Sequence, residues 1–169
     1  MTTATDKQAP TRWLDEEEMA AWLPLIRVVS LLPQALDRQL REEVGISHTY
    51  YQMMAVLSAQ PDRTASMGDL ARLTTTSPSR LSHAVTSLEQ RGWLRRSPCA
   101  TDRRVQYAAL TDEGFRVLEA VAPTHVAEVR RRVFDHLTGE QVRQLRSIGE
   151  TLLEALDEDA TPEPTVRDS

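Results

Sequence analysis

The sequence predicts a mainly α-helical protein with one small β-hairpin. Three observations lead to this fold class. Apolar residues recur at helical spacing along most of the 169-residue chain, capping residues bound these stretches, and only residues 93–110 show two short strand-like runs separated by a turn. The length suits one domain with a core of its own.

The first expected helix spans residues 14–44. Asp15 and Glu18 have the spacing of a capping box at its start, and Gly45 is expected to end it. Pro24 and Pro33 lie inside this stretch. A proline removes a backbone hydrogen bond within a helix, so we expect them to kink the helix or to split it into two.

The centre of the chain, residues 67–111, predicts two short helices and a hairpin. Residues 67–73 form about two helical turns, and a polar link of three threonines follows. The second helix is expected to begin at Ser77, whose side chain can accept a backbone N–H bond, and to end at Gly92. Pro78 suits its first position. Helix, short link and polar-faced helix form a helix-turn-helix pattern, and a further helix is expected before it over residues 47–59.

The helix that begins at Ser77 has two different faces. One face is an apolar stripe of Leu81, Ala84, Val85 and Leu88. The other carries short or planar hydrogen-bonding groups: Ser79, Arg80, Ser82, His83, Thr86, Ser87 and Gln90. A helix that docks into the DNA major groove needs such groups near its N-terminus, whereas the alternative use of this face is contact with solvent.

Two strands follow, over residues 93–96 and 104–110, with a turn-rich connection between them. Arginines near the tip of such a hairpin suit phosphate contact or insertion into a narrow minor groove. Arg95 and Arg96 alternate sides along the first strand, so we expect one to face phosphate and the other solvent.

The charge is unevenly distributed. The whole chain has a net charge of −5, which argues against a protein that coats DNA without preference. Residues 66–104 hold seven arginines against three acidic residues, a net charge of +4, which leaves −9 for the remainder. A basic head on an acidic body concentrates the attraction to phosphate in one place.

This central region resembles the winged helix-turn-helix of the MarR family, the multiple antibiotic resistance regulators. The matching segments are Gly92-Trp93-Leu94-Arg95-Arg96, Asp102-Arg103-Arg104 and Leu110-Thr111-Asp112-Glu113-Gly114. The resemblance covers residues 14–156 and is strongest over 67–115. It implies an obligate homodimer that binds double-stranded DNA sequence-specifically, more often as a repressor on a palindromic operator, and that a small phenolic or other lipophilic effector often releases.

The polar helix face and the resemblance together give the expected site. The DNA-binding residues would be Ser77, Ser79, Arg80, Ser82, His83, Arg95, Arg96, Asp102, Arg103 and Arg104. Arg80 is expected to contact a guanine edge or a neighbouring phosphate. The resemblance makes Arg103 or Arg104 the wing arginine that touches DNA, with Asp102 accepting hydrogen bonds that fix its direction.

The resemblance also implies an effector pocket where the long helices meet the head. The residues expected to line it are Trp22, Tyr50, Tyr51, Met54 and Phe115. Core packing is the alternative use of such side chains.

The remaining helices are expected over residues 112–136, with a kink at Pro123, and 138–156, with Thr138 and Gln141 as a capping box. Leu145, Ile148, Leu152 and Leu156 share one face of the last helix. A two-fold dimer interface would cover this stripe, and a monomeric core is the alternative.

The domain organisation follows from these elements. Residues 47–111 would form the winged helix-turn-helix DNA-binding domain, and residues 13–46 and 112–156 a helical dimerisation region. The polar ends, residues 1–12 and 157–169, are expected to be disordered.

Several other classes of protein are not expected. The scattered histidines His48, His83, His125 and His136 do not have metal-ligand spacing, so neither a metal nor a cofactor is expected. Ser79 and His83 lack an orienting acid and a nucleophile-elbow motif, and no glycine-rich phosphate loop is present, so we do not expect an enzyme. A winged helix that binds protein in place of DNA remains the alternative function.

The compartment is expected to be the cytoplasm. The single cysteine, Cys99, excludes an internal disulfide framework, and no signal-peptide pattern opens the chain. Cys99 is either a redox-sensitive thiol or a spectator. The apolar stretch 20–36 is interrupted by two prolines and an arginine, and we expect it to be too short and too broken to span a membrane.

Overall fold

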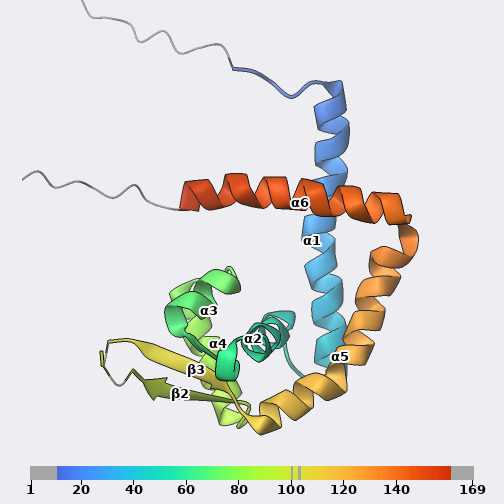
Figure 1. Ribbon diagram of the computed structural model, residues 1–169. Coiled ribbons are helices and arrows are strands. Elements are labelled where there is room, and N and C mark those ends of the chain that lie inside the picture. The colour runs from blue at the N-terminus through green and yellow to red at the C-terminus, as the bar shows by residue number, and fades with distance from the viewer. Residues whose placement is uncertain (1–10, 100, 103, 161–169) are drawn as a thin grey trace, which may run out of the picture.

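The computed structural model describes residues 11–99, 101, 102 and 104–160. Its elements, in chain order, are α1 (Glu16–Val44), α2 (His48–Ser58), η1 (Pro61–Arg63), β1 (Thr64–Ser66), α3 (Met67–Leu73), α4 (Pro78–Gln90), β2 (Leu94–Pro98), β3 (Gln106–Leu110), α5 (Asp112–Arg132), η2 (Phe134–His136) and α6 (Gly139–Ala160). This mainly helical architecture with a small antiparallel sheet confirms the predicted fold class (Figure 1).

α1 is one uninterrupted helix of 29 residues, so the prediction that its prolines split it in two is wrong. Pro24 and Pro33 each remove only one backbone donor. The carbonyl groups that lose their partner belong to Ala20 and Val29, which are exposed and therefore open to water.

The predicted caps at the ends of the long helices are confirmed. At the start of α1, the Asp15 carboxylate accepts the Glu18 N–H at 2.8 Å, and the Glu18 carboxylate accepts the Asp15 N–H at 2.9 Å. Gly45 ends the helix with a left-handed φ of 67°. Before α6, Thr138 and Gln141 make the corresponding pair of bonds, at 3.2 and 2.9 Å.

The small sheet has the strand order β1-β3-β2. The predicted hairpin is β2 with β3, which pair from Leu94 opposite Leu110 to Pro98 opposite Gln106. The third strand, β1, was not predicted, because three residues are too few to show an alternating pattern. It pairs with the other edge of β3 and ties the start of α3 to the wing.

The core of the head lies between α2, α3, α4 and the sheet. The predicted stripe of α4, namely Leu81, Ala84, Val85 and Leu88, is buried. It packs with Met53, Met54, Leu57, Leu70 and Ala108, all of which are fully buried. Each such side chain contributes about 1.5–3 kcal/mol by its removal from water, so the polar face of α4 is held outward by the burial of its opposite face.

The C-terminal helices differ from the prediction in their bounds. α5 ends at Arg132 and is followed by the short η2, where one helix to residue 136 was expected. α5 contains Pro123 and changes direction along its length (Figure 1), and proline is a common cause of such a bend. α6 continues to Ala160, past the predicted end at Leu156, so residues 157–160 are helical and not part of a disordered tail. The predicted tails over residues 1–10 and 161–169 lie outside the described residues.

Two helices expose apolar faces in the described chain. α1 packs against α5 and α2 through its C-terminal part, while its N-terminal part extends beyond the head (Figure 1). The exposed apolar side chains of α1 are Met19, Trp22, Leu23, Leu25, Ile26, Val28, Val29 and Leu31. Those of α6 are Leu145, Ile148, Leu152, Leu153 and Leu156. We call these two sets the body faces, and they are far larger than the scattered apolar residues of an ordinary surface.

By length and composition alone, α1 contains an 18-residue stretch that is apolar enough to cross a membrane, with a mean hydropathy of 1.5. The predicted interruption of this stretch does not occur, so that reason against a membrane span fails. The C-terminal part of α1 is instead part of the folded domain, because Leu36 and Leu40 are buried in it.

Candidate nucleic-acid interface

The N-terminal half of α4 presents the predicted reading residues to solvent. Ser79, Arg80, Ser82 and His83 are all exposed, while the apolar residues between them point into the core. Short hydroxyl groups and one guanidinium at the start of a helix can approach base edges and phosphates directly.

Ser77 is the N-cap of α4, but its side chain makes no capping hydrogen bond. The predicted capping bond is therefore wrong, and Pro78 at the first helical position sets the helix start without it. The Ser77 hydroxyl remains exposed beside the free N–H groups of the first turn. Hydroxyl and free amides together suit an anion such as a phosphate.

The two strand arginines behave differently. Arg95 is exposed. Arg96 turns back onto α4, where its Nη2 donates to the Ser82 carbonyl at 2.6 Å and to the Thr86 hydroxyl at 2.7 Å. Its Nε lies 3.2 Å from a Glu89 carboxylate oxygen. The expected alternation is present, but the second arginine faces the recognition helix and not solvent.

Glu89 and Thr86 were not singled out as partners of Arg96 by the sequence. The available signal was an acidic residue near the end of a helix in a segment of net positive charge, six and seven residues before the two strand arginines. Glu89 also accepts the Arg96 backbone N–H at 2.8 Å.

At the tip of the wing, Asp102 holds the backbone that carries Arg104. Its carboxylate accepts the Arg104 N–H at 2.9 Å, and its carbonyl accepts the Val105 N–H at 3.0 Å. The Arg104 side chain is 95% exposed, with Nε 3.9 Å from Asp102. Asp102 therefore fixes the loop and leaves the guanidinium free to reach a ligand. The neighbouring Arg103 lies outside the described residues.

Cys99 lies at the base of this loop. The Thr101 hydroxyl, 3.2 Å from its sulfur, and the backbone N–H groups of Thr101 and Asp102 lower the pKa of the thiol from 9.0 to about 7. Hydrogen bonds to a thiolate stabilise its charged form. Cys99 is thus more easily ionised than an ordinary cysteine.

Four of the five residues predicted to line an effector pocket come together, but as part of one hydrophobic cluster, and Trp22 lies apart from them. Met54 and Tyr51 belong to the buried core, Tyr50 packs against its edge, and Phe115 lies under the Arg63 guanidinium at 3.8 Å. Trp22 is on the exposed face of α1. Tyr51 and Met54 of α2 therefore take part in core packing, which was the alternative use expected of them.

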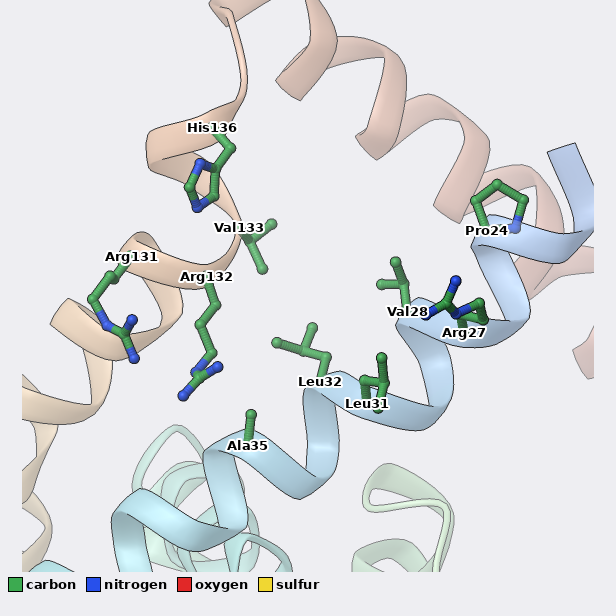
Figure 2. A pocket seen from close by; sticks show the side chains of 10 residues that line it. All are labelled: Pro24, Arg27, Val28, Leu31, Leu32, Ala35, Arg131, Arg132, Val133 and His136. Atoms are coloured by element: carbon green, nitrogen blue, oxygen red, sulfur yellow. The ribbon is translucent and has the colours of Figure 1, made fainter. Parts of the chain in front are cut away.

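A cavity of about 530 Å³ lies elsewhere, between α1 and the end of α5 (Figure 2). Val28, Leu31, Leu32 and Ala35 form its apolar wall on α1, and Arg131, Arg132, Val133 and His136 line the opposite side, with Pro24 and Arg27 at its far end. Arg131 and Arg132 share the carboxylate of Glu128. The cavity therefore combines an apolar wall with an excess of positive charge.

In the described part of the chain, no three His, Cys, Asp or Glu side chains are grouped so that they could hold a metal ion.

Comparison with known proteins places these features in a family. A sequence model of the MarR family matches residues 44–105, which run from the end of α1 to the wing. The chain is 32% identical over 136 residues to the HTH-type transcriptional regulator PecS of Dickeya dadantii (strain 3937), covering 80% of this chain and 81% of that one. It is 27% identical over 115 residues to the transcriptional repressor MprA of Escherichia coli (strain K12), covering 68% and 64% of the two chains.

The solved structures agree. The chain is 43% identical to Sco3205, a MarR family transcriptional regulator from Streptomyces coelicolor whose structure was solved in complex with DNA. The superposition has a TM-score of 0.83 and covers 94% of this chain and 95% of that one. These relatives are transcriptional regulators, which are not enzymes, so the enzyme alternative is excluded. The chain belongs to the MarR family of winged helix-turn-helix transcriptional regulators, proteins that bind DNA.

Proposed function

We propose that the protein is a cytoplasmic homodimeric repressor that binds a palindromic operator and is released by a small lipophilic ligand. The observation that carries this proposal is the polar start of α4, where Ser79, Arg80, Ser82 and His83 stand exposed on a helix locked by its buried stripe. Two relatives support this function: Sco3205 was solved in complex with DNA, and MprA is a transcriptional repressor.

In this proposal Ser77, Ser79 and Arg80 contact phosphate and base edges in the major groove. Arg104 and Arg103 of the wing would reach the flanking minor groove, and Arg95 would contact the backbone. The net charge of +4 over residues 66–104 supports attraction to phosphate at this end of the molecule.

The body faces on α1 and α6 support the dimer. Val29 and Ile148 are both 57% exposed, and they belong to apolar sets that a second copy of the chain would cover. Each protomer would then present one α4, and two-fold symmetry would set the two recognition helices about one DNA turn apart.

The cavity between α1 and α5 is where we propose that an effector binds (Figure 2). Its volume is within the range of about 300–1,000 Å³ usual for small-molecule sites. An apolar wall facing arginines suits a lipophilic anion. Because Val28 and Leu31 belong both to the cavity wall and to the body face of α1, a ligand there would alter the spacing of the heads and lower operator affinity. Benzoate is a suitable first probe, and a Leu32→Trp variant, which fills the cavity, should bind DNA but lose the response.

The decisive experiment is selection of bound fragments from a random DNA pool by the purified full-length protein. We expect an inverted repeat with half-sites about one helical turn apart. If selection at low salt recovered no enriched sequence, the result would contradict the proposal and favour a winged helix that binds protein.

A further inference from the structure

Arg96 of β2 joins the wing to the recognition helix through several contacts at once. Its guanidinium bonds the Ser82 carbonyl and the Thr86 hydroxyl of α4, and its Nε lies 3.2 Å from the Glu89 carboxylate. Its backbone N–H donates to the same carboxylate at 2.8 Å. Glu89 thus holds both the strand and the side chain of Arg96.

These contacts are shielded from solvent more than an ordinary surface ion pair. The side chains of Arg96 and Glu89 are 27% and 32% exposed, whereas Arg104 at the wing tip is 95% exposed. The planar guanidinium suits this arrangement, because its Nη2 bonds a carbonyl and a hydroxyl while its Nε lies within ion-pair distance of the Glu89 carboxylate, without a hydrogen bond of its own. A lysine has the same charge but a single ammonium group, which cannot reach the three partners at once.

The contacts also divide the polar face of α4. The Thr86 hydroxyl donates to the Ser82 carbonyl at 2.9 Å and accepts from Arg96, so both its functions are occupied within the protein. Ser79, Arg80 and His83 make no comparable contact to the wing and stay exposed. The polar side of the helix therefore has one row, Ser82, Thr86 and Glu89, that is joined to β2, and a second group, Ser79, Arg80 and His83, that is not.

We propose that Arg96 is a positioning residue that fixes the angle between the wing and α4. With this angle fixed, α4 can bind the major groove of a half-site while the wing binds its minor groove. This inference rests on the proposed function. When α4 and the wing belong to one rigid head, binding of α4 in the major groove places the wing at the minor groove, so the two contacts strengthen each other. Without the Arg96 contacts, the wing would still carry Arg104 but would no longer be held at the minor groove.

Two competing roles make opposite predictions. If Arg96 were a phosphate contact, its loss would lower binding to all DNA and reduce the salt dependence by about one counterion. If Glu89 were only a negative charge near DNA, Glu89→Gln would tighten binding to every duplex. The positioning role predicts that Glu89→Gln weakens binding to the operator alone.

The test measures binding by fluorescence anisotropy on three duplexes: the operator recovered by selection, the same operator with its flanking base pairs removed, and a scrambled sequence. The variants are Arg96→Lys and Glu89→Gln, with Thr86→Val as a milder third that removes only the hydroxyl. Arg116→Lys is the matched control, since it makes the same change at an exposed arginine of α5 that pairs with Glu113 and is not among the proposed DNA contacts. Circular dichroism and thermal unfolding show that each variant is folded.

We expect the wild type to lose affinity when the flanks are removed. Arg96→Lys and Glu89→Gln should bind the full operator at least about tenfold more weakly, and should no longer distinguish it from the trimmed one. Their binding to scrambled DNA and its salt dependence should be unchanged, and Arg116→Lys should keep the flank effect. The operator affinity of Thr86→Val should lie between that of the wild type and those of Arg96→Lys and Glu89→Gln.

Persistence of the flank effect in the folded variants, or tighter binding of all DNA by Glu89→Gln, would overturn the positioning role alone. If Arg96→Lys and Glu89→Gln did not fold, the flank effect in Thr86→Val would decide. A wild type with no preference among the three duplexes would overturn the proposed function, and the positioning role with it.

Discussion

The buried imidazole of His125 in α5 lies 4.3 Å from the ring of Tyr51 in α2, with the two planes tilted by 47°. Its Nδ1 is 3.2 Å from the side-chain oxygen of Gln39 in α1, and the ring of His48 is 5.5 Å away. These contacts join α1, α2 and α5 at the place where the long helices meet the head.

Burial lowers the pKa of both His125 and His48 below the ordinary 6.5. The neighbouring charge of His48 lowers that of His125 further, while Glu43, Glu128 and Asp37 act weakly in the opposite direction. The unfolded chain therefore takes up protons near pH 6.5 that the folded chain resists. Folding stability should be highest above this value and should fall as the pH decreases through the window down to the folded pKa values.

Urea unfolding at about pH 7.5 and about pH 5.5 tests this pH dependence. His125→Gln should roughly halve the loss of stability between the two conditions, because one of two buried histidines is removed. His136→Gln, at an exposed position in η2, is the control and should lose as much as the wild type. The same loss in both variants would contradict the assignment to His125 and His48. The carboxylates with lowered pKa act only below their ordinary values of 3.8 and 4.5, outside this window.

Cys99 should react as a partly ionised thiol. With a pKa of about 7, roughly half of it is thiolate at neutral pH. Thr101→Val removes the hydroxyl, which makes the largest contribution to the lowered pKa. Alkylation by iodoacetamide near neutral pH should then slow several-fold, as the pKa moves back toward 9.0. The chain has one cysteine, so the labelling reports this site only, and Cys99→Ser gives the blank. An unchanged pH profile in the variant would show that Thr101 does not tune the thiol.

Gly114 in α5 has no room for a side chain. A Cβ there would lie 2.2 Å from the Trp93 carbonyl oxygen and 2.8 Å from Leu110 Cδ1. Gly114→Ala should lower the free energy of unfolding by about 1–3 kcal/mol, because the backbone carbonyl cannot move aside. Gly68→Ala is the matched control, since the nearest atom to its Cβ would be at 3.8 Å, and it should be neutral or stabilising by up to about 1 kcal/mol. Thermal unfolding of the two variants measures the change. Equal changes in the free energy of unfolding for Gly114→Ala and Gly68→Ala would contradict the packing argument.

Local signals in the sequence were enough to predict most of the fold. The capping boxes at Asp15 and Thr138 and the apolar stripe of α4 depend on residues within one or two turns, so the sequence contains the whole pattern. The continuity of α1 was not predictable in this way, because it depends on whether the carbonyls that lose a partner face solvent. β1 was missed because its pairing with β3 joins residues that are distant in the sequence.

The site was predictable only to the level of which residues are polar and near the head. Alternation along β2 separates Arg95 from Arg96 but does not say which side faces α4. Met54 and Tyr51 fit a ligand pocket and a core equally well by residue type, and only their burial in the core of the folded head decides for the core.

The body face of α6 should be sensitive to charge. Ile148 is 57% exposed in the single chain, and in the proposed dimer it would be covered. Ile148→Glu would bury an unpaired carboxylate, so the dimer dissociation constant should rise by at least about a hundredfold. Sedimentation velocity at micromolar concentration would show a monomer, and operator affinity would fall because the two half-sites are no longer bound together.

Ser147→Glu is the control for that experiment. At about 100° per residue, Ser147 lies on the opposite side of α6 from the leucine and isoleucine stripe. It adds the same charge one residue away and should leave the dimer intact. Dissociation by both variants, or by neither, would count against the body face as the dimer interface.

Arg80 and Arg104 should affect DNA binding in different ways. Arg80 stands at the start of α4, so Arg80→Ala should cost about 1–3 kcal/mol on the operator and relax the preference at one position in each half-site. Arg104 stands on the wing loop held by Asp102, so Arg104→Ala should weaken binding to all sequences and flatten the salt dependence. Repeating the DNA selection with each variant and measuring affinity against salt separates the two effects. If the wild type and both variants bound operator and scrambled DNA equally, neither assignment would stand, because base contact must appear as preference and phosphate contact as salt dependence.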